Sequence, residues 1–287
     1  MRPKNGIPSQ EEYHNLIHTP LFQVMESFSD DFLIKFDFLK YKYKWVKDPF
    51  HQWSRQWEYP YVFTSIKNYL HTHKISAPKI LDAGSGITFF PYYLSNEIED
   101  ATIACCDYDR ELLPFFNLIN KGRSHTRQVE FHYADLHTLP FEDSLFDIVY
   151  TISVLEHTKN YASIISEFAR VLKPGGTLII TFDIALDGVS DVAYHDAEWI
   201  LAALSREFNL TTVRRPIKEQ IIERGLFTTD YAKKLNEKLL PWQYPLLSLI
   251  KSSAISRRIP KRLSKCLTVY CETVCKNEIR SSAYEDR

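Results

Sequence analysis

Two closely spaced glycines and two aspartates stand at the ends of short apolar runs, where strands of a sheet would end. "KILDAG" leads into Gly84 and Gly86, "ATIACCD" ends in Asp107, and "VEFHYAD" ends in Asp135. Glycines at this spacing let the backbone bend tightly and bring its N–H groups against a bound molecule. Carboxylates beside such a turn accept hydrogen bonds from hydroxyl and amino groups. These residues could therefore bind a polar ligand.

The two aspartates suggest which ligand this is. Asp107, at the end of the second apolar run, can accept hydrogen bonds from both hydroxyls of a ribose, and each such charge-assisted bond contributes about 1.5–3 kcal/mol. Asp135, after the third run, can accept a hydrogen bond from the exocyclic amine of adenine. Either residue alone could equally cap a helix or form a turn. Together they indicate an adenosine-containing ligand.

The residues after the glycine turn restrict the ligand further. A dinucleotide-binding loop would continue as G-x-G-x-x-G, because a pyrophosphate must lie on the helix N-terminus. Ile87, Thr88 and Phe89 follow Gly86 instead, and no Lys followed by Ser or Thr is present to grip a phosphate. The expected ligand therefore contains adenosine without a pyrophosphate, and an NAD-type oxidoreductase is disfavoured.

Apolar runs that alternate with helix-like stretches must position these residues. This alternation indicates β-α-β units and an α/β, doubly wound, mostly parallel sheet, in which ligands bind beyond the carboxyl ends of the strands. The predicted sheet has seven strands, at residues 79–84, 101–107, 129–135, 146–152, 176–183, 209–215 and 266–276.

Four segments are expected along the 287 residues. Residues 1–75 would form an aromatic-rich helical lid, and residues 76–215 the ligand-binding core. Residues 216–262 would form a helical insertion or second lid before the last strand. Residues 263–287 would contain that strand and a C-terminal tail.

Aromatic side chains of the first segment have two interpretations. Trp53, Trp57, Tyr59 and Tyr61 could stack on a sugar or an aromatic ring of a bound molecule. They could equally pack in the core beneath the lid. The sequence leaves both interpretations open.

Four stretches resemble a known family: "ILDAGSG", "CCDYD", "YADLHTLPFEDSLFDIVYTISVLEH" and "VLKPGGTLIITFD". They resemble class I S-adenosylmethionine-dependent methyltransferases over roughly residues 60–215 plus the last strand. The order "FDIV…VLEH…VLKPGG" is specific to this family. The resemblance implies a Rossmann-like methyltransferase fold and S-adenosyl-L-methionine as the methyl donor.

The same resemblance assigns six residues to the donor. The methionine portion would lie against Asp82, Gly84 and Gly86, the ribose against Asp107, and the adenine against Asp135 with Leu136 beside it. Thr88 stands where the family often has a third glycine, which affects the tightness of the loop.

Methyl transfer is an in-line displacement, so the enzyme mainly aligns the reacting atoms, and a general base helps when the acceptor is a hydroxyl. His157 occupies the position where similar small-molecule O-methyltransferases place a histidine, and His195 is the second candidate. Alternatively, His157 could be hydrogen-bonded within its loop, and His195 could belong to a segment that caps a helix starting near Glu198. Polar residues after the fourth and fifth strands complete the set of candidates: Glu156, Asp183, Asp187, Asp191 and Tyr194.

Two further classes of site are disfavoured. Relatives that bind a divalent metal carry a Glu three residues before the Glu-His pair, and this chain has Ser153 there, so no metal is predicted. Enzymes of this fold that methylate base or glutamine nitrogens carry an Asn- or Asp-Pro-Pro-aromatic turn after the fourth strand, where this chain reads "YTISVLEH". The formal net charge of −1 also gives no electrostatic footprint for nucleic acid.

The sequence predicts a cytoplasmic protein, because it shows no signal-peptide core and no run of about 18 apolar residues. Five cysteines, an odd number, argue against a disulfide framework, and the last three stand in a stretch that is typical of a strand. Buried, reduced thiols are therefore expected.

The acceptor is expected to be a small molecule, methylated at a hydroxyl of a glycan precursor or secondary metabolite. One alternative is a catalytically silent adenosyl-binding partner protein. Another is a membrane-associated, lipid-linked acceptor, because the apolar stretch "LLPWQYPLLSLIK" precedes a basic cluster that could contact an anionic membrane or a phosphorylated acceptor. That cluster could also be a solvated face, and the sequence does not predict the oligomeric state.

Overall fold

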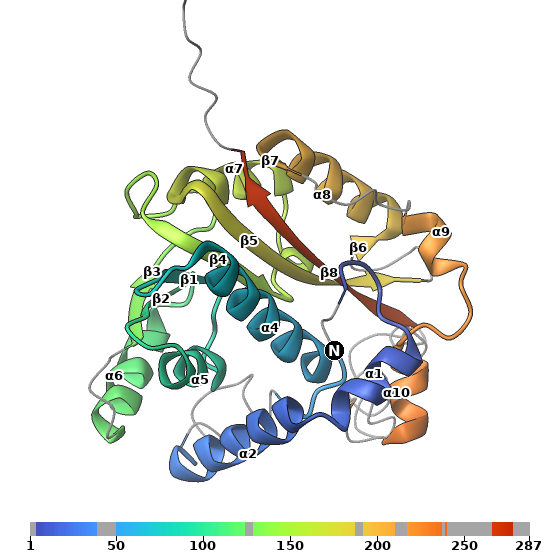
Figure 1. The fold of residues 1–287 in the computed structure, drawn as a ribbon, viewed down its shortest axis with the longest axis horizontal. Helices are drawn as coiled ribbons and strands as arrows, with labels where there is room; N and C mark the ends of the chain where they lie inside the picture. The colour runs from blue at the N-terminus through green and yellow to red at the C-terminus, as the bar shows by residue number, and fades with distance from the viewer. Residues whose placement is uncertain are drawn as a thin grey trace, which may run out of the picture.

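An eight-stranded mixed sheet organises the structure (Figure 1). The computed structural model describes residues 4–38, 50–123, 129–186, 192–209, 217–236, 239 and 266–277. The strands lie in the order β3-β2-β1-β4-β5-β8-β7, with β6 paired to β5. Their bounds are β1 Lys79–Ala83, β2 Thr102–Asp107, β3 Val129–Tyr133, β4 Phe146–Ile152, β5 Leu172–Ala185, β6 Val192–Ala193, β7 Phe208–Asn209 and β8 Leu267–Lys276.

The strand directions identify the edge of this sheet at which a ligand is expected. β1 pairs in parallel with both β2 and β4, and β3 and β5 extend the parallel set on either side. The chain order therefore reverses between β1 and β4, and ligands of open α/β sheets bind beyond the carboxyl ends of strands at such a point. β8 is antiparallel to β5 and to β7. The predicted doubly wound, mostly parallel fold is confirmed.

All seven predicted strands have a counterpart, with differences at their ends. β5 is longer than the predicted 176–183 at both ends, because β8 pairs with it as far as Ala185 and Leu172 pairs with Phe146 of β4. β6, a two-residue strand, was not predicted. β7 contains only the start of the predicted strand 209–215, since residues 210–216 lie outside the described part of the chain.

Helices cover both faces of the sheet, because successive strand residues point to opposite sides. Ile80 and Ile148 pack with α4, α5 and α6, whereas Leu81 and Val149 pack with α7 and α8. Runs buried on both faces are almost continuously apolar, which is why the sequence pattern located them. The bounds are α4 Arg55–His73, α5 Phe90–Glu97, α6 Leu113–Gly122, α7 Tyr161–Val171 and α8 Tyr194–Glu207, with the short 3-10 turns η1 Arg110–Leu112 and η2 Leu155–His157.

The N-terminal segment is helical, as predicted. Ser9 and Glu12 form a capping box at the start of α1 (Gln10–Ile17), and the Thr19 side chain caps α2 (Pro20–Lys35). The segment also joins the sheet, since Gly6 exchanges two backbone hydrogen bonds with Cys271 of β8, at 2.7 and 3.1 Å.

The aromatic side chains of this segment belong to the core. Trp53, Trp57, Tyr59 and Tyr61 are all buried. The ring of Tyr59 lies 4.8 Å from that of Phe90 at the start of α5. Of the two interpretations, the structure therefore supports packing in the core and not stacking on a ligand.

Part of the predicted insertion 216–262 is described and is helical, in α9 (Ile217–Ile221) and α10 (Thr229–Leu235). The apolar stretch after Leu239 and the basic cluster that follows it lie outside the described residues. In the part of the chain that is described, no helix combines the length and the apolar character needed to cross a membrane. All five cysteines are free, and three of them, Cys105, Cys106 and Cys271, are buried.

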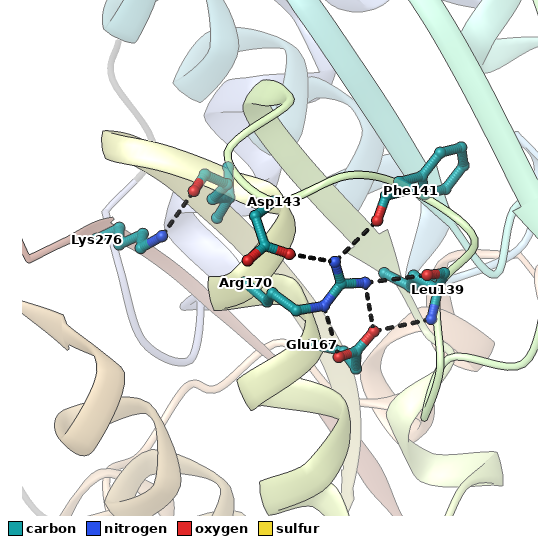
Figure 2. Close-up of polar contacts among 7 residues, drawn as sticks. Leu139, Phe141, Asp143, Glu167, Arg170 and Lys276 are labelled. Atoms are coloured by element: carbon teal, nitrogen blue, oxygen red, sulfur yellow. Dashed lines mark hydrogen bonds and ion pairs between the residues drawn. The ribbon is translucent and has the colours of Figure 1, made fainter.

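Arg170 of α7 fastens the long loop between β3 and β4, as Figure 2 shows. Its guanidinium donates to the backbone oxygens of Leu139 and Phe141, at 3.0 and 2.8 Å, and to the Asp143 carboxylate at 2.7 Å. Glu167, which pairs with Arg170, accepts a hydrogen bond from the Leu139 N–H at 2.8 Å. One charge pair thus holds the loop against α7.

Replacing this guanidinium should release the loop. We expect Arg170→Ala to lower the free energy of unfolding by about 1–3 kcal/mol, because two backbone carbonyls and a carboxylate lose their donor. The control is Arg206→Ala, on the exposed side of α8, which should stay within about 0.5 kcal/mol of the parent protein. Urea denaturation measures both, and equal midpoints for the two variants would contradict the role of Arg170.

Candidate functional site

The turn after β1 has a backbone that requires glycine. Gly84 and Gly86 have φ of +80° and +53°, in the left-handed region. The N–H groups of Gly84 and Ser85 donate to the Cys106 carbonyl of β2 at 2.9 and 3.0 Å. A Cβ atom on Gly84 would lie 2.6 Å from a methyl carbon of Val154, which follows β4. The turn is therefore wedged between the ends of the two strands that flank β1.

Asp107 joins this turn to the end of β2. One oxygen of its carboxylate accepts a hydrogen bond from the Gly86 N–H at 2.9 Å, and the other accepts one from the Asp109 N–H at 3.0 Å. A carboxylate offers about four lone-pair positions, so these two bonds leave capacity for further donors such as a pair of hydroxyls.

Asp82, on β1, is buried. Burial raises the pKa of its carboxyl to about 8, the charge of Asp107 adds to the shift, and the Tyr150 hydroxyl opposes it. At neutral pH this raised pKa favours the protonated form of Asp82. A positively charged group bound beside it would favour the ionised form.

Asp135 is exposed and is held by His137. One carboxylate oxygen accepts the backbone N–H of His137 at 2.9 Å and lies 2.7 Å from Nδ1 of its ring. The Nε2 atom lies 2.9 Å from the Lys159 carbonyl oxygen. Both ring nitrogens face acceptors, and an imidazolium, which donates from both, suits this arrangement. The hydrogen bonds from His137 lower the pKa of Asp135, and the Asp135 carboxylate raises the pKa of His137.

The His137 ring has two structural effects. It leaves the second carboxylate oxygen of Asp135 for another donor, and it ties the loop after β3 to the loop after η2. Leu136, between the two polar residues, is buried with the core on the α7 side of the sheet.

The two predicted base candidates are both at the surface. His157 ends η2 and is exposed, and its backbone N–H donates to the Val154 carbonyl at 2.9 Å. The His195 side chain is 54% exposed and lies 3.5 Å from the Asp196 carboxylate. Its ring contacts those of Tyr194 and Trp199.

The structure corrects the predicted start of α8. The helix begins at Tyr194 instead of near Glu198, so His195 lies within its first turn. Asp196 sets this start, because its carboxylate accepts the Ala193 N–H at 3.1 Å. Of the other candidates after the fifth strand, Asp187 and Asp191 lie outside the described residues.

A buried charge pair from α4 completes this edge of the sheet, and the sequence reasoning missed it. Glu58 is fully buried, with one carboxylate oxygen 2.5 Å from the Arg55 guanidinium. Its other oxygen accepts hydrogen bonds from Ser153 after β4, at 2.8 Å, and from Thr181 of β5, at 2.5 Å. Arg55 also donates to the Ser153 hydroxyl. The available signal was a pair of opposite charges three residues apart in the aromatic stretch "SRQWEYPY".

Residues 81–180 match the model of a family described as "Methyltransferase domain". This segment of the chain is a methyltransferase domain. It contains most of β1, all of β2 to β4, most of β5 and all six predicted donor residues. The match confirms the resemblance seen in the sequence.

Two curated relatives align with part of the chain. Phosphoethanolamine N-methyltransferase 1 of Triticum aestivum is 27% identical over 120 residues, which cover 42% of this chain and 24% of that protein. O-methyltransferase cnsE of Penicillium expansum is 30% identical over 114 residues, which cover 40% and 39%. The chain thus spans less than half the length of either relative.

A solved structure extends the similarity of fold beyond the methyltransferase domain. The [4+2]-cyclase SpnF is 15% identical, covers 96% of this chain and 100% of its own, and aligns with a TM-score of 0.51. Arg55, Glu58 and His195 lie outside the matched segment 81–180, whereas His157 lies inside it. In the described part of the chain, no group of three or more His, Cys, Asp or Glu residues is placed to hold a metal ion.

The raised pKa of Asp82 predicts a pH dependence of donor binding. The pKa of its carboxyl is about 8, and an ammonium group bound beside it would need the carboxylate. Affinity for S-adenosyl-L-homocysteine, which keeps the ammonium group of the donor, should therefore rise between about pH 6 and pH 8, by up to about tenfold per pH unit. Calorimetry in buffers of different ionisation enthalpy should detect release of the proton.

Asp82→Asn is the matched variant for this measurement. It should bind more weakly than the parent protein and show a flatter dependence on pH, since no carboxyl group remains to titrate. Binding by the parent protein that neither varies with pH nor releases a proton would contradict the assignment.

Proposed function

We propose that this protein is an S-adenosyl-L-methionine-dependent methyltransferase that acts on a small-molecule acceptor. The observation that carries the proposal is the meeting of Asp82, Gly84, Gly86 and Asp107 at the carboxyl edge of β1 and β2, inside a methyltransferase domain. The strand order reverses between β1 and β4, at this same edge.

The residues at this edge fit the donor. Asp82 would face the ammonium group, and Asp107 has lone pairs left for the two ribose hydroxyls. The second oxygen of Asp135 would accept the adenine amine, and Leu136 would provide an apolar contact beside the ring. S-adenosyl-L-methionine supplies a methyl group on a positively charged sulfur, so the protein has to orient the acceptor and exclude water.

For the acceptor, we propose a hydroxyl of a glycan precursor or secondary metabolite, covered by the N-terminal segment as a lid. His157 and His195 are the proposed bases, since each lies just beyond the carboxyl end of a parallel strand. The cytoplasmic location and the lipid-linked alternative stay predictions from the sequence.

A second candidate function is a silent adenosyl-binding partner. The similarity in fold to a protein named a [4+2]-cyclase favours keeping it, because one fold can serve different chemistries. Binding of the donor without methylation of any acceptor from a metabolite extract, followed with labelled S-adenosyl-L-methionine, would favour this candidate.

Asp107→Ala tests the donor site. Loss of the hydrogen bonds to the ribose should weaken binding of S-adenosyl-L-methionine by at least about tenfold, as measured by calorimetry. The circular dichroism spectrum should stay unchanged. Glu99→Ala, at an exposed position after α5, is the control and should bind as the parent does. Unchanged affinity of Asp107→Ala, or a preference of the parent protein for NAD, would overturn the assignment.

His157→Ala and His195→Ala test the proposed bases. The variant that lacks the base should lose about 100-fold to 10,000-fold in kcat and the acidic limb of its pH–rate profile, because a protonated imidazole cannot accept the proton. Its affinity for the donor should stay the same. The other variant serves as the control, and two variants with parental profiles would remove both residues from the chemistry.

A further inference from the structure

The Arg55–Glu58 pair interacts electrostatically with a third titratable group, Glu156. Glu58 uses both carboxylate oxygens, on Arg55, Ser153 and Thr181, and so has a structural role at the ends of β4 and β5. Glu156 stands in η2, three residues after Ser153. Its Oε2 atom is buried and has no hydrogen-bond partner among the described residues.

A carboxylate in this position is costly. Burying a polar oxygen without a partner costs about 1–3 kcal/mol, and more when it is charged. Burial raises the pKa of Glu156 to about 8, and the charge of Glu58 adds to the shift while Arg55 opposes it. Ser153 and the backbone of Glu156 hydrogen-bond to this carboxyl, whereas its Oε2 atom has no partner among the described residues.

The charged and titratable groups around Glu156 come from three elements. Arg55 and Glu58 belong to α4, Tyr161 belongs to α7, and Asp183 of β5 interacts with Arg55. The one cation of this set faces three carboxyl groups. The surroundings therefore favour a bound cation or a neutral hydrogen-bond donor, and they repel an anion.

The position of Glu156 relative to the donor site is fixed by a direct contact. Val154, two residues earlier, packs against Gly84 so closely that a Cβ atom there would lie 2.6 Å away. Tyr59 of α4 adds a second link, because its hydroxyl interacts electrostatically with both Arg55 and Asp82. Glu156 thus follows the carboxyl end of β4, the strand next to β1, and ligands of open α/β sheets bind beyond such strand ends.

We propose that Glu156 anchors the acceptor and selects it by charge. The site would bind acceptors with an amine or a hydroxyl next to the methylated position and reject carboxylates. The inference rests on the proposed function, because it places the acceptor beside the donor turn. Glu156 acts here as a specificity-determining residue, while the proton of the acceptor passes to a separate base.

Three probes of one shape and different charge test the proposal: 2-phenylethylamine, 2-phenylethanol and phenylacetate. Each is titrated into the full chain saturated with S-adenosyl-L-homocysteine. We expect the amine and the alcohol to bind at least about tenfold more tightly than phenylacetate. Glu156→Gln should lose this preference. Glu130→Gln, the same substitution at an exposed position of β3, should keep it. Amine binding should also strengthen as the pH approaches about 8, with release of a proton.

Several outcomes would overturn the proposal: tighter binding of phenylacetate, binding of none of the three probes, or an unchanged preference in Glu156→Gln. Affinity for S-adenosyl-L-homocysteine, measured first, separates two failures. If the parent protein does not bind it, the proposed function fails. If the parent and Glu156→Gln bind it equally but the charge preference is absent, only the role of Glu156 fails.

A measurement without any acceptor checks the state of Glu156. Its pKa is about 8 in the folded protein against an ordinary value of 4.5, so the folded state binds the proton more tightly. Stability should therefore fall as pH rises through this interval, and Glu156→Gln should reduce the fall and raise the Tm at pH above about 8. A Tm with the same pH dependence in both proteins would show that Glu156 is already partnered or solvated, and would overturn the proposal.

Discussion

The close approach of Val154 to Gly84 is the constraint on which the carboxyl edge of the sheet depends. β1 lies between β2 and β4, so the turn that follows it must fit between two strand ends. On one side it hydrogen-bonds to the Cys106 carbonyl and to Asp107, and on the other it meets Val154. A left-handed backbone without a side chain satisfies both sides. The ends of β2 and β4 are thereby held in one geometry.

The N-terminal segment belongs to the same edge. Glu58 joins α4 to the ends of β4 and β5 through two hydroxyl groups, and Arg55 partly neutralises the charge. Removing one partner of such a pair costs far more free energy than the intact pair contributes to stability. The pair therefore fixes the position of α4 more than it stabilises the fold. The residues that surround the proposed acceptor thus come partly from outside the matched domain.

The sequence predicted the parallel sheet and the glycine turn, because strands buried on both faces are continuously apolar and each ends at a residue suited to a turn. It could not predict features set by contacts distant in the sequence. The extra length of β5 depends on β4 and β8, and the burial of Glu58 depends on Ser153 and Thr181. The aromatic residues near Trp53 could not be assigned from the sequence either, since core packing and ligand stacking favour the same residue types.

The pairing of β8 with β5 has a consequence for how the chain folds. The two strands pair from Thr177–Cys275 to Ala185–Leu267. β8 also exchanges backbone hydrogen bonds with Gly6. Both contacts close very long loops, and the one to Gly6 spans nearly the whole chain. During synthesis the four strands β1 to β4 can assemble early, but β5 keeps an unpaired edge until β8 leaves the ribosome. That apolar edge is where a nascent chain would be most prone to aggregate and where a chaperone would act.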